Sequence, residues 1–194
     1  MQLNDETAQE YLTLFDDYAG LTKTDENTED NKKKLTSVKD SVRILGICKK
    51  INKTLTQEQK VVVLVRLFEL VNADRKFTDQ RMAIINTVAE VFNLSKEEFR
   101  SIEDFVVKTQ PEQLDNPAIM LINDQESKPE QGKHIRTEKL HGNIFILRIS
   151  SVDLYFLKYT GKEDLFLNGM GISNKRIYLF ATGSTVKLPK GKPI

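Results

Sequence analysis

The stretch from Ser95 to Asn123, SKEEFRSIEDFVVKTQPEQLDNPAIMLIN, contains the point at which the hydrophobic pattern of the chain changes. It opens with a helix-capping box, Ser95-Lys96-Glu97-Glu98, and apolar residues follow at helical spacing. It closes with Ala118–Ile122, a short apolar run that is typical of a strand. The pattern predicts a helical region and a β region that meet near Gln110–Pro117.

The distribution of glycine, of proline and of charged residues along the chain changes at the same place. Only two of the nine glycines and none of the five prolines precede residue 110, and frequent turn residues favour β structure. The net charge of the 194 residues is +1, yet residues 118–194 alone carry 12 basic and 7 acidic side chains. We therefore predict an α+β chain with two domains: an all-α bundle at residues 1–112 and a small β-sandwich at residues 113–194.

Five helices are predicted in the first part. They cover about residues 5–18, residues 31–52, and three further segments that begin after Thr56, Thr78 and Ser95. Residues 20–30 are polar and aperiodic and predict a mobile loop. The helix after Thr56 has apolar residues around most of its circumference, so we expect it at the centre of the bundle. Very short connections indicate that the last three helices pack together.

Six strands are predicted in the second part, and polar residues 123–134 predict a long loop. The strands are Ala118–Ile122, Ile144–Ile149, Leu154–Tyr159, Leu165–Asn168, Arg176–Phe180 and Thr185–Leu188. Asn168-Gly169 is a strong hairpin signal because both residues tolerate positive φ. Short strands at this spacing favour a small sandwich.

The motifs of common enzymes are missing from the sequence. It contains no phosphate-binding Gly-x-x-x-x-Gly-Lys-Ser/Thr, no Gly-x-Ser-x-Gly and no His-Glu-x-x-His. Its two histidines, His134 and His141, are expected in exposed glycine-containing turns that flank a strand. The single cysteine, Cys48, lies on an apolar helix stripe and is expected to be a buried small hydrophobe. No membrane span or signal peptide is evident. We expect a cytoplasmic chain with no catalytic residue, no cofactor and no metal of its own.

The segment between the third and fourth predicted helices has the most informative chemistry. Asp74 is a weak candidate for holding a cation, because a carboxylate at a helix–helix turn needs further carboxylates to do so. Arg75, Lys76 and Arg81 crowd it and favour a salt-bridged loop. We take two exposed turns as candidate interaction sites: Asp74, Arg75, Lys76 and Phe77 in this loop, and Asn168 and Gly169 in the hairpin.

Aromatic and basic residues alternate near one predicted strand. The set is Tyr155, Phe156, Lys158, Tyr159 and Lys162, and aromatic rings beside basic groups can stack on nucleic-acid bases. The alternative is that Tyr155, Leu157 and Tyr159 form one face of an ordinary strand, and we favour it.

The third to fifth predicted helices resemble the TerB (tellurite-resistance) family over about residues 55–107. The resemblance rests on Leu55–Gln59, Leu67–Asp74 and Ile84–Leu94. The family pattern is Ala-Asp-Gly, a short spacer, Ser/Thr, two residues and Glu. Ala73, Asp74 and Thr78 match it, whereas arginines at positions 75 and 81 replace the Gly and the Glu. The resemblance therefore implies the helical fold but not the family's acidic cluster.

The second part is similar to the last strands of a forkhead-associated (FHA-like) sandwich. The similarity rests on Phe166-Leu167-Asn168-Gly169 and on Gly183-Ser184-Thr185-Val186. The motifs of the family's phosphothreonine site have no counterpart here, so no phosphopeptide pocket is implied.

The order of the two regions resembles the N-terminal part of bacterial ABC-transporter ATP-binding proteins. It implies a non-catalytic regulatory and protein-interaction region, with the ATPase domain and its ATP and Mg outside this chain. The implied partner is the rest of the transporter, with neither nucleic acid nor membrane insertion, and we expect Ile194 to end an excised fragment. Two alternatives stay open: a stand-alone TerB-like stress-response protein that binds a divalent cation, and a nucleic-acid binder that uses the basic β domain.

Overall fold

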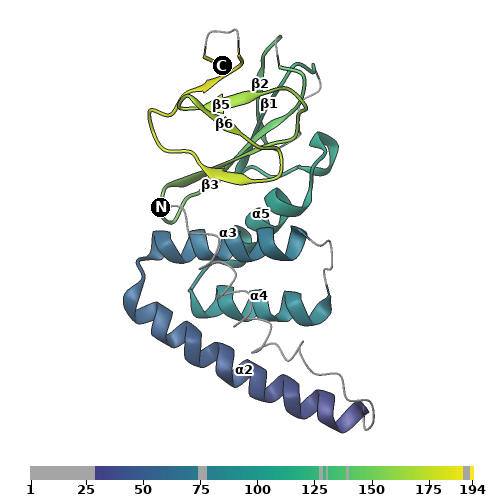
Figure 1. The fold of residues 1–194 in the computed structure, drawn as a ribbon, viewed down its shortest axis with the longest axis vertical. Coiled ribbons are helices and arrows are strands. Elements are labelled where there is room, and N and C mark those ends of the chain that lie inside the picture. The colour runs from purple at the N-terminus through teal and green to yellow at the C-terminus, as the bar shows by residue number, and fades with distance from the viewer. Residues whose placement is uncertain (1–28, 74–77, 127–128, 130, 139, 190–192) are drawn as a thin grey trace. The chain divides into compact units, whose positions relative to one another are not determined.

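The computed structural model of the chain describes residues 29–73, 78–126, 129, 131–138, 140–189 and 193–194. Its element order is α+β: four α-helices in the described ranges are followed by a β region with two sheets (Figure 1). Two compact units make up the chain, residues 1–53 and residues 54–194. None of the described helices has the length and apolarity needed to cross a membrane.

Helix α2 spans Glu29–Thr54 and confirms the helix predicted at residues 31–52. It begins earlier than expected, so Glu29 and Asp30 are helical and do not belong to the predicted loop. Cys48 is buried, as its place on the apolar stripe predicts. The helix expected at residues 5–18 and residues 20–28 of the expected loop lie outside the described residues.

Three further helices confirm the predicted caps. They are α3 (Gln57–Ala73), α4 (Asp79–Val91) and α5 (Lys96–Val107). Before α3, the Gln59 side chain accepts the Thr56 amide at 3.0 Å, and the Thr56 hydroxyl accepts the Gln59 amide at 3.4 Å. The Thr78 hydroxyl caps α4 and the Ser95 hydroxyl caps α5. Each cap gives a free backbone amide a partner and defines the helix start.

Helix α3 is the central helix of this bundle, as its apolar circumference predicts. Its buried residues are Val61, Leu64, Val65 and Phe68. It packs against both α4 and α5, and the Phe68 ring lies 5.3 Å from the Phe99 ring of α5. In Figure 1, α3 and α5 lie between α4 and the β region.

The β region contains a five-stranded sheet A in the order β2-β1-β3-β4-β7 and a three-stranded sheet B in the order β6-β5-β8. Sheet A is formed by β1 (Ile119–Asn123), β2 (Lys133–Arg136), β3 (Ile144–Ile149), β4 (Leu154–Tyr159) and β7 (Ile177–Leu179). Sheet B is formed by β5 (Leu165–Leu167), β6 (Met170–Ile172) and β8 (Val186–Lys187). A short 3₁₀ turn, η1 (Pro111–Gln113), connects α5 to the sheet.

The six predicted strands are confirmed to within one residue at either end, and the described residues contain two further strands. Strand β2 lies in the segment expected to be a loop, and it pairs parallel with β1. Its residues are mostly exposed and polar, so the alternation that indicates a strand is missing there. Strand β6 follows Asn168-Gly169 directly and contains Gly171, so its three residues carry little strand signal.

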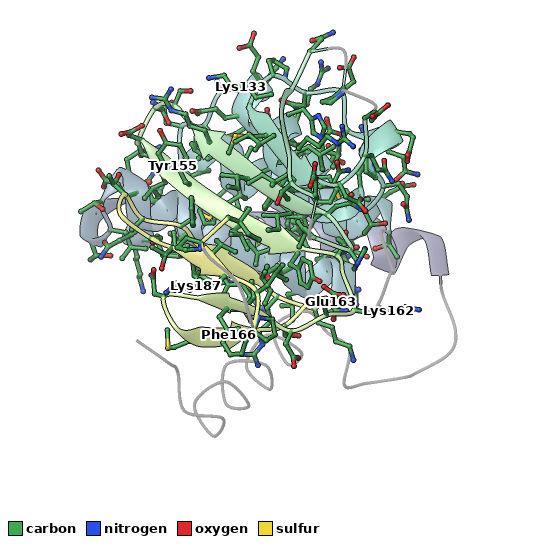
Figure 2. All side chains as sticks on the ribbon, turned by 90° about the horizontal axis from the view of Figure 1, so that it is seen from above. Lys133, Tyr155, Lys162, Glu163, Phe166 and Lys187 are labelled. Atoms are coloured by element: carbon green, nitrogen blue, oxygen red, sulfur yellow. The ribbon has the colours of Figure 1, made fainter. Side chains whose placement is uncertain are left out.

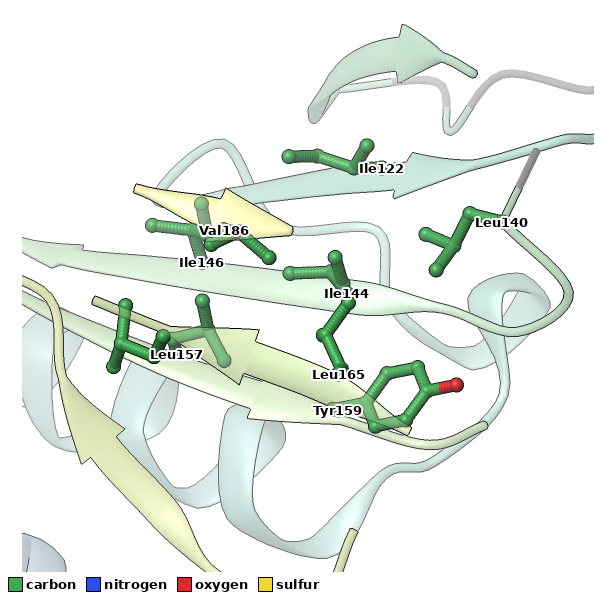
Figure 3. Packing of buried hydrophobic residues seen from close by; sticks show 9 residues of the cluster. Ile122, Leu140, Ile144, Ile146, Leu157, Tyr159, Leu165 and Val186 are labelled. Carbon is green, nitrogen blue, oxygen red and sulfur yellow. The ribbon is translucent and has the colours of Figure 1, made fainter. Parts of the chain in front are cut away.

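The two sheets pack face to face through one apolar cluster (Figure 3). Its members are Ile122, Leu140, Ile144, Ile146, Leu157, Tyr159, Leu165, Leu167 and Val186. Because side chains alternate along a strand, Phe145, Phe156 and Lys158 point to the other face of sheet A, where α5 lies. Sheet A is thus buried on both faces.

The domain boundary predicted near residue 112 coincides with η1. This position lies inside the compact unit formed by residues 54–194.

Candidate functional site

The predicted hairpin at Asn168-Gly169 forms between β5 and β6. Asn168 has φ 52° and Gly169 has φ 83°, which is the pair of positive angles that a two-residue turn of this kind needs. Both residues are exposed. Met170, the next residue, has 71% of its surface exposed. The turn is therefore followed directly by an exposed apolar side chain.

The Asn168 side chain is held in place by the turn before β8. Its Oδ1 accepts the Thr185 amide at 2.8 Å, its Nδ2 donates to the Ser184 hydroxyl at 3.2 Å, and its own amide donates to the Thr185 carbonyl at 2.9 Å. These bonds join the Leu-Asn-Gly and Gly-Ser segments that carried the FHA-like similarity. Asn168 thus has a structural role that fixes the tip.

The outer face of sheet B continues from this turn. Phe166 pairs with Gly171 on one side and with Lys187 on the other; Figure 2 labels Phe166 and Lys187. A Cβ added at Gly171 would lie 3.9 Å from the Phe166 ring, which is an ordinary contact distance, so the ring does not require a glycine there. The face offers a half-exposed aromatic ring beside a basic group.

The second candidate turn cannot be placed. Asp74, Arg75, Lys76 and Phe77 lie outside the described residues, between the end of α3 at Ala73 and the cap at Thr78. In the described ranges, no three His, Cys, Asp or Glu side chains gather closely enough to hold a metal ion. A cation at Asp74 stays a prediction, and so does an interaction at this loop.

The aromatic surface considered for nucleic acid is mostly inside the molecule. Phe156 and Tyr159 are essentially inaccessible, and Lys158 is 6% exposed. Tyr155, Leu157 and Tyr159 share one face of β4 in or against the cluster between the sheets. This confirms the interpretation as an ordinary strand face, and it leaves no stacking platform at these buried rings.

Lys158 is a buried basic side chain, which the sequence pattern does not predict. Its Nζ donates to the backbone carbonyls of Phe105 and Lys108 at the end of α5. The same Nζ lies 5.2 Å from the centres of the Phe105 and Phe145 rings. Burial lowers the pKa of Lys158 to about 7. A lysine in the otherwise apolar strand Leu154–Tyr159, on the face opposite Leu157, was the available signal.

Two side chains of α3 reach the free edge of sheet A. Glu69 accepts the amide of Ile177 in β7 at 2.7 Å, and Arg66 donates to the carbonyl of the same residue at 2.9 Å. Glu69 and Arg66 also form an ion pair. The two side chains bond the backbone N–H and C=O of Ile177, in the place that a neighbouring strand would take. This contact protects the edge of sheet A from pairing with other chains.

A polar network joins β1, β2 and the turn before β3. Asn123 is fully buried; its Oδ1 lies 2.8 Å from His134 Nε2, and its Nδ2 donates to Asn143 Oδ1 at 2.9 Å. Both ends of the buried amide therefore have partners, as burial of a polar group requires. The exposed His141 lies 3.7 Å from Asp124. The network positions β2 and does not resemble a catalytic arrangement.

Cys48 is a buried thiol in α2. Burial raises the pKa of its thiol, so the group is protonated near neutral pH. A protonated buried thiol is a weak nucleophile and a weak metal ligand. This agrees with the prediction of a small buried hydrophobe.

Comparison with known proteins bears on the helical part. A family model described as "Tellurite resistance protein TerB" matches residues 1–104, which is more than half of the 194 residues and extends into α5. No curated protein and no solved structure matches the chain. The match confirms the resemblance of the helical part to this family. The β region lies outside the matched residues. The chain therefore belongs to the tellurite resistance protein TerB family.

Proposed function

We propose that this chain is a non-catalytic regulatory and protein-interaction region of an ABC-type transporter ATP-binding protein, with the ATPase domain outside these 194 residues. The proposal rests on a TerB-family helical part followed by a two-sheet β region in which the Asn168 side chain bonds Ser184 and Thr185. The two segments that these bonds join are the ones on which the resemblance to a forkhead-associated sandwich rests. ATP and Mg then belong to the ATPase domain, and the partner is the rest of the transporter. The chain would act in the cytoplasm beside the inner face of the membrane.

The contact surface in this proposal is the tip of the β5–β6 hairpin. Met170 is the most exposed large apolar side chain of the described residues, and Asn168 and its bonds to residues 184 and 185 hold the turn rigid. A rigid tip loses little conformational entropy on binding, and an exposed methionine adapts well to an apolar recess in a partner protein. The loop at Asp74–Phe77 is the second proposed contact.

The reading frame beyond Ile194 gives the first test. We expect a phosphate-binding Gly-x-x-x-x-Gly-Lys-Ser/Thr there, in a domain that hydrolyses ATP, and no ATP hydrolysis by residues 1–194 alone. A stop codon after Ile194 would contradict the ABC-type parent, and saturable hydrolysis by this chain would contradict its non-catalytic role.

Binding of the downstream domain to this chain gives the second test. We expect Met170→Glu to weaken the complex at least about tenfold, because a buried charge without a partner opposes docking. Ile135→Glu is the matched control, since Ile135 is an exposed apolar residue of β2, far along the chain from the tip. Equal affinities for the two variants would remove the tip as the contact.

The family match favours a second candidate function, that of a stress-response protein. In this candidate, Asp74 would help to hold a divalent cation. Calorimetry with calcium, magnesium and manganese tests it. Heat of binding that Asp74→Ala abolishes would support this candidate. No heat with any of the three ions would exclude it.

A further inference from the structure

Sheet A has two edge strands, and they differ in what their outward backbone groups bond. At β7, the side chains of Glu69 and Arg66 bond the outward N–H and C=O of Ile177. At the other edge, β2 pairs with β1 alone (Figure 1). Within the described ranges, no residue bonds the outward backbone groups of β2. An edge with unpaired N–H and C=O groups can accept one more strand.

The register of the β1–β2 pair identifies the outward groups of β2. The Thr137 amide, directly after the strand, donates to the carbonyl of Asn123 in β1 at 2.8 Å. In a parallel pair, the backbone groups of successive residues alternate between the two sides of a strand. Ile135 therefore also bonds toward β1, whereas the backbone groups of His134 and Arg136 face outward. These two residues offer their N–H and C=O groups to a further strand.

Strand β2 is fixed in an extended conformation before any partner binds. All four of its residues pair with β1, and the Thr137 bond continues the ladder beyond them. The His134 ring lies 2.8 Å from the side chain of the buried Asn123. A strand that is already formed loses little conformational entropy on binding.

The side chains of β2 indicate the chemistry of a partner. Lys133 and Ile135 share one face of the strand, and the register places Ile135 beside Ile122 of the apolar cluster. Ile135 has 47% of its surface exposed, so the apolar row of sheet A continues to this edge. Lys133 and Arg136, at the two ends of the strand, are exposed basic groups. Arg136 pairs with Glu126 at 3.1 Å, but more than half of each side chain is exposed, so a second carboxylate can compete for it.

The basic groups of β2 oppose pairing with a second copy of this chain. If two copies of β2 paired antiparallel in full register, Lys133 of one copy would lie opposite Arg136 of the other. Like charges directly opposite each other destabilise a strand pair. A segment with carboxylates at these positions is attracted instead, so the same charges that reject a copy select an acidic partner.

We propose that β2 is a docking edge for an extended acidic segment of another protein, which pairs with β2 and extends sheet A. The segment places acidic residues opposite Lys133 and Arg136 and an apolar residue opposite Ile135. Its backbone bonds supply affinity, and these side chains supply selectivity. The contact goes beyond the proposed function: it lies on sheet A, whereas the Met170 tip belongs to sheet B, and it takes a different partner.

Two capped peptides test the edge on the intact chain. The pattern of Ser-Thr-Glu-Thr-Val-Glu-Thr-Ser fits parallel pairing, and that of Ser-Thr-Glu-Val-Thr-Glu-Thr-Ser fits antiparallel pairing. We expect one of them, added to about 1 mM in an NMR titration, to slow amide exchange at His134 and Arg136 in proportion to the fraction bound. Exchange at Ile135 should change little, because its N–H already faces β1.

Two outcomes of this titration would overturn the proposal. One is the absence of any shift in the β2 signals with either peptide. The other is a shift of these signals without slower exchange at His134 and Arg136, which would show surface attraction and no added strand. Slower exchange at the same amides with rising protein concentration and no peptide would assign the edge to a second copy, and this too would refute the acidic partner.

Charge reversal tests the selectivity of the edge. Lys133→Glu should weaken binding of the acidic peptide at least about tenfold, and a peptide with lysine in place of the opposing glutamate should restore it. Lys162→Glu is the matched control, because Lys162 is also exposed, lies between β4 and β5, and undergoes the same change of charge. Equal affinities of the two variants for the acidic peptide would show that Lys133 does not select the partner and would contradict the proposal.

Discussion

The carboxylate of Glu69 in α3 accepts the backbone amide of Ile177 in β7, with 2.7 Å between Oε1 and N. The two residues are 108 positions apart. Arg66, one helical turn before Glu69, bonds the carbonyl of the same Ile177, so a helix satisfies both outward backbone groups of an edge-strand residue. The helical bundle therefore completes sheet A instead of only lying beside it.

Removal of the Glu69 carboxylate should weaken the bundle–sheet contact. We expect Glu69→Ala to lower the free energy of unfolding by about 1–3 kcal/mol, because a partly buried bond to a charged acceptor is lost and the β7 amide loses its partner. Chemical denaturation measures the loss, and amide exchange at Ile177 should accelerate. Glu90→Ala, an exposed change on α4, serves as the control and should stay within about 0.5 kcal/mol of the wild type. Equal stability of the two variants would show that the bond contributes nothing.

Glu98 connects the start of α5 to the sheet. Its Oε1 accepts the Ser151 amide at 3.0 Å, so the second predicted capping box is only half formed: Ser95 caps α5, but Glu98 turns toward the β region. We expect Glu98→Ala to cost about 0.5–1.5 kcal/mol more than Glu97→Ala, since both remove an acidic charge from the first turn of α5 and only Glu98 loses the bond. Urea unfolding of both variants measures the difference, which should vanish if the Ser151 contact is not formed in solution.

Asn168 contributes to the turn in two ways, through its positive φ and through its side-chain hydrogen bonds. Two substitutions distinguish the contributions of these features to stability. Asn168→Gly keeps the positive φ and loses the bonds to residues 184 and 185, whereas Asn168→Ala loses both. We expect the alanine variant to be less stable than the glycine variant by about 1 kcal/mol. Thermal unfolding of the pair measures it. Greater stability of the alanine variant would contradict the left-handed turn.

Gly161 should not tolerate a side chain. A Cβ at this position would overlap the ring and hydroxyl of the buried Tyr159, although φ of Gly161 is unremarkable. We expect Gly161→Ala to destabilise the chain by about 1–3 kcal/mol through overpacking. The control is Gly46→Ala in α2, where no neighbouring atom lies within 4 Å of an added Cβ and where alanine should stabilise the helix by about 0.5–1 kcal/mol. Calorimetric unfolding distinguishes the two, and a neutral Gly161→Ala would mean that Tyr159 moves aside at little cost.

Much of the fold follows from local sequence. The caps at Thr56, Thr78 and Ser95, the strands β3 and β4 and the Asn168-Gly169 turn all appear where their residues predict them. Strand β2 does not, because an exposed polar strand carries no alternation and exists through its pairing with β1. The candidate site could be predicted only in part: the hairpin tip is exposed as expected, whereas the burial of Lys158 is not evident from local sequence, because it depends on α5 covering the other face of sheet A.

The sequence by itself determined the type of each described α-helix and strand except β2 and β6, the caps and turn that bound several of them, and the membership of the helical part in the TerB family. These depend on hydrophobic period and on bonds between residues a few positions apart, which a sequence displays directly. Only the tertiary structure decided that sheet A is buried on both faces, that Glu69 meets Ile177 and that Lys158 meets Phe105, 53 positions away. The bonds of such groups depend on which distant backbone atoms the fold brings within reach, and the pKa of Lys158 depends on the water that the fold excludes.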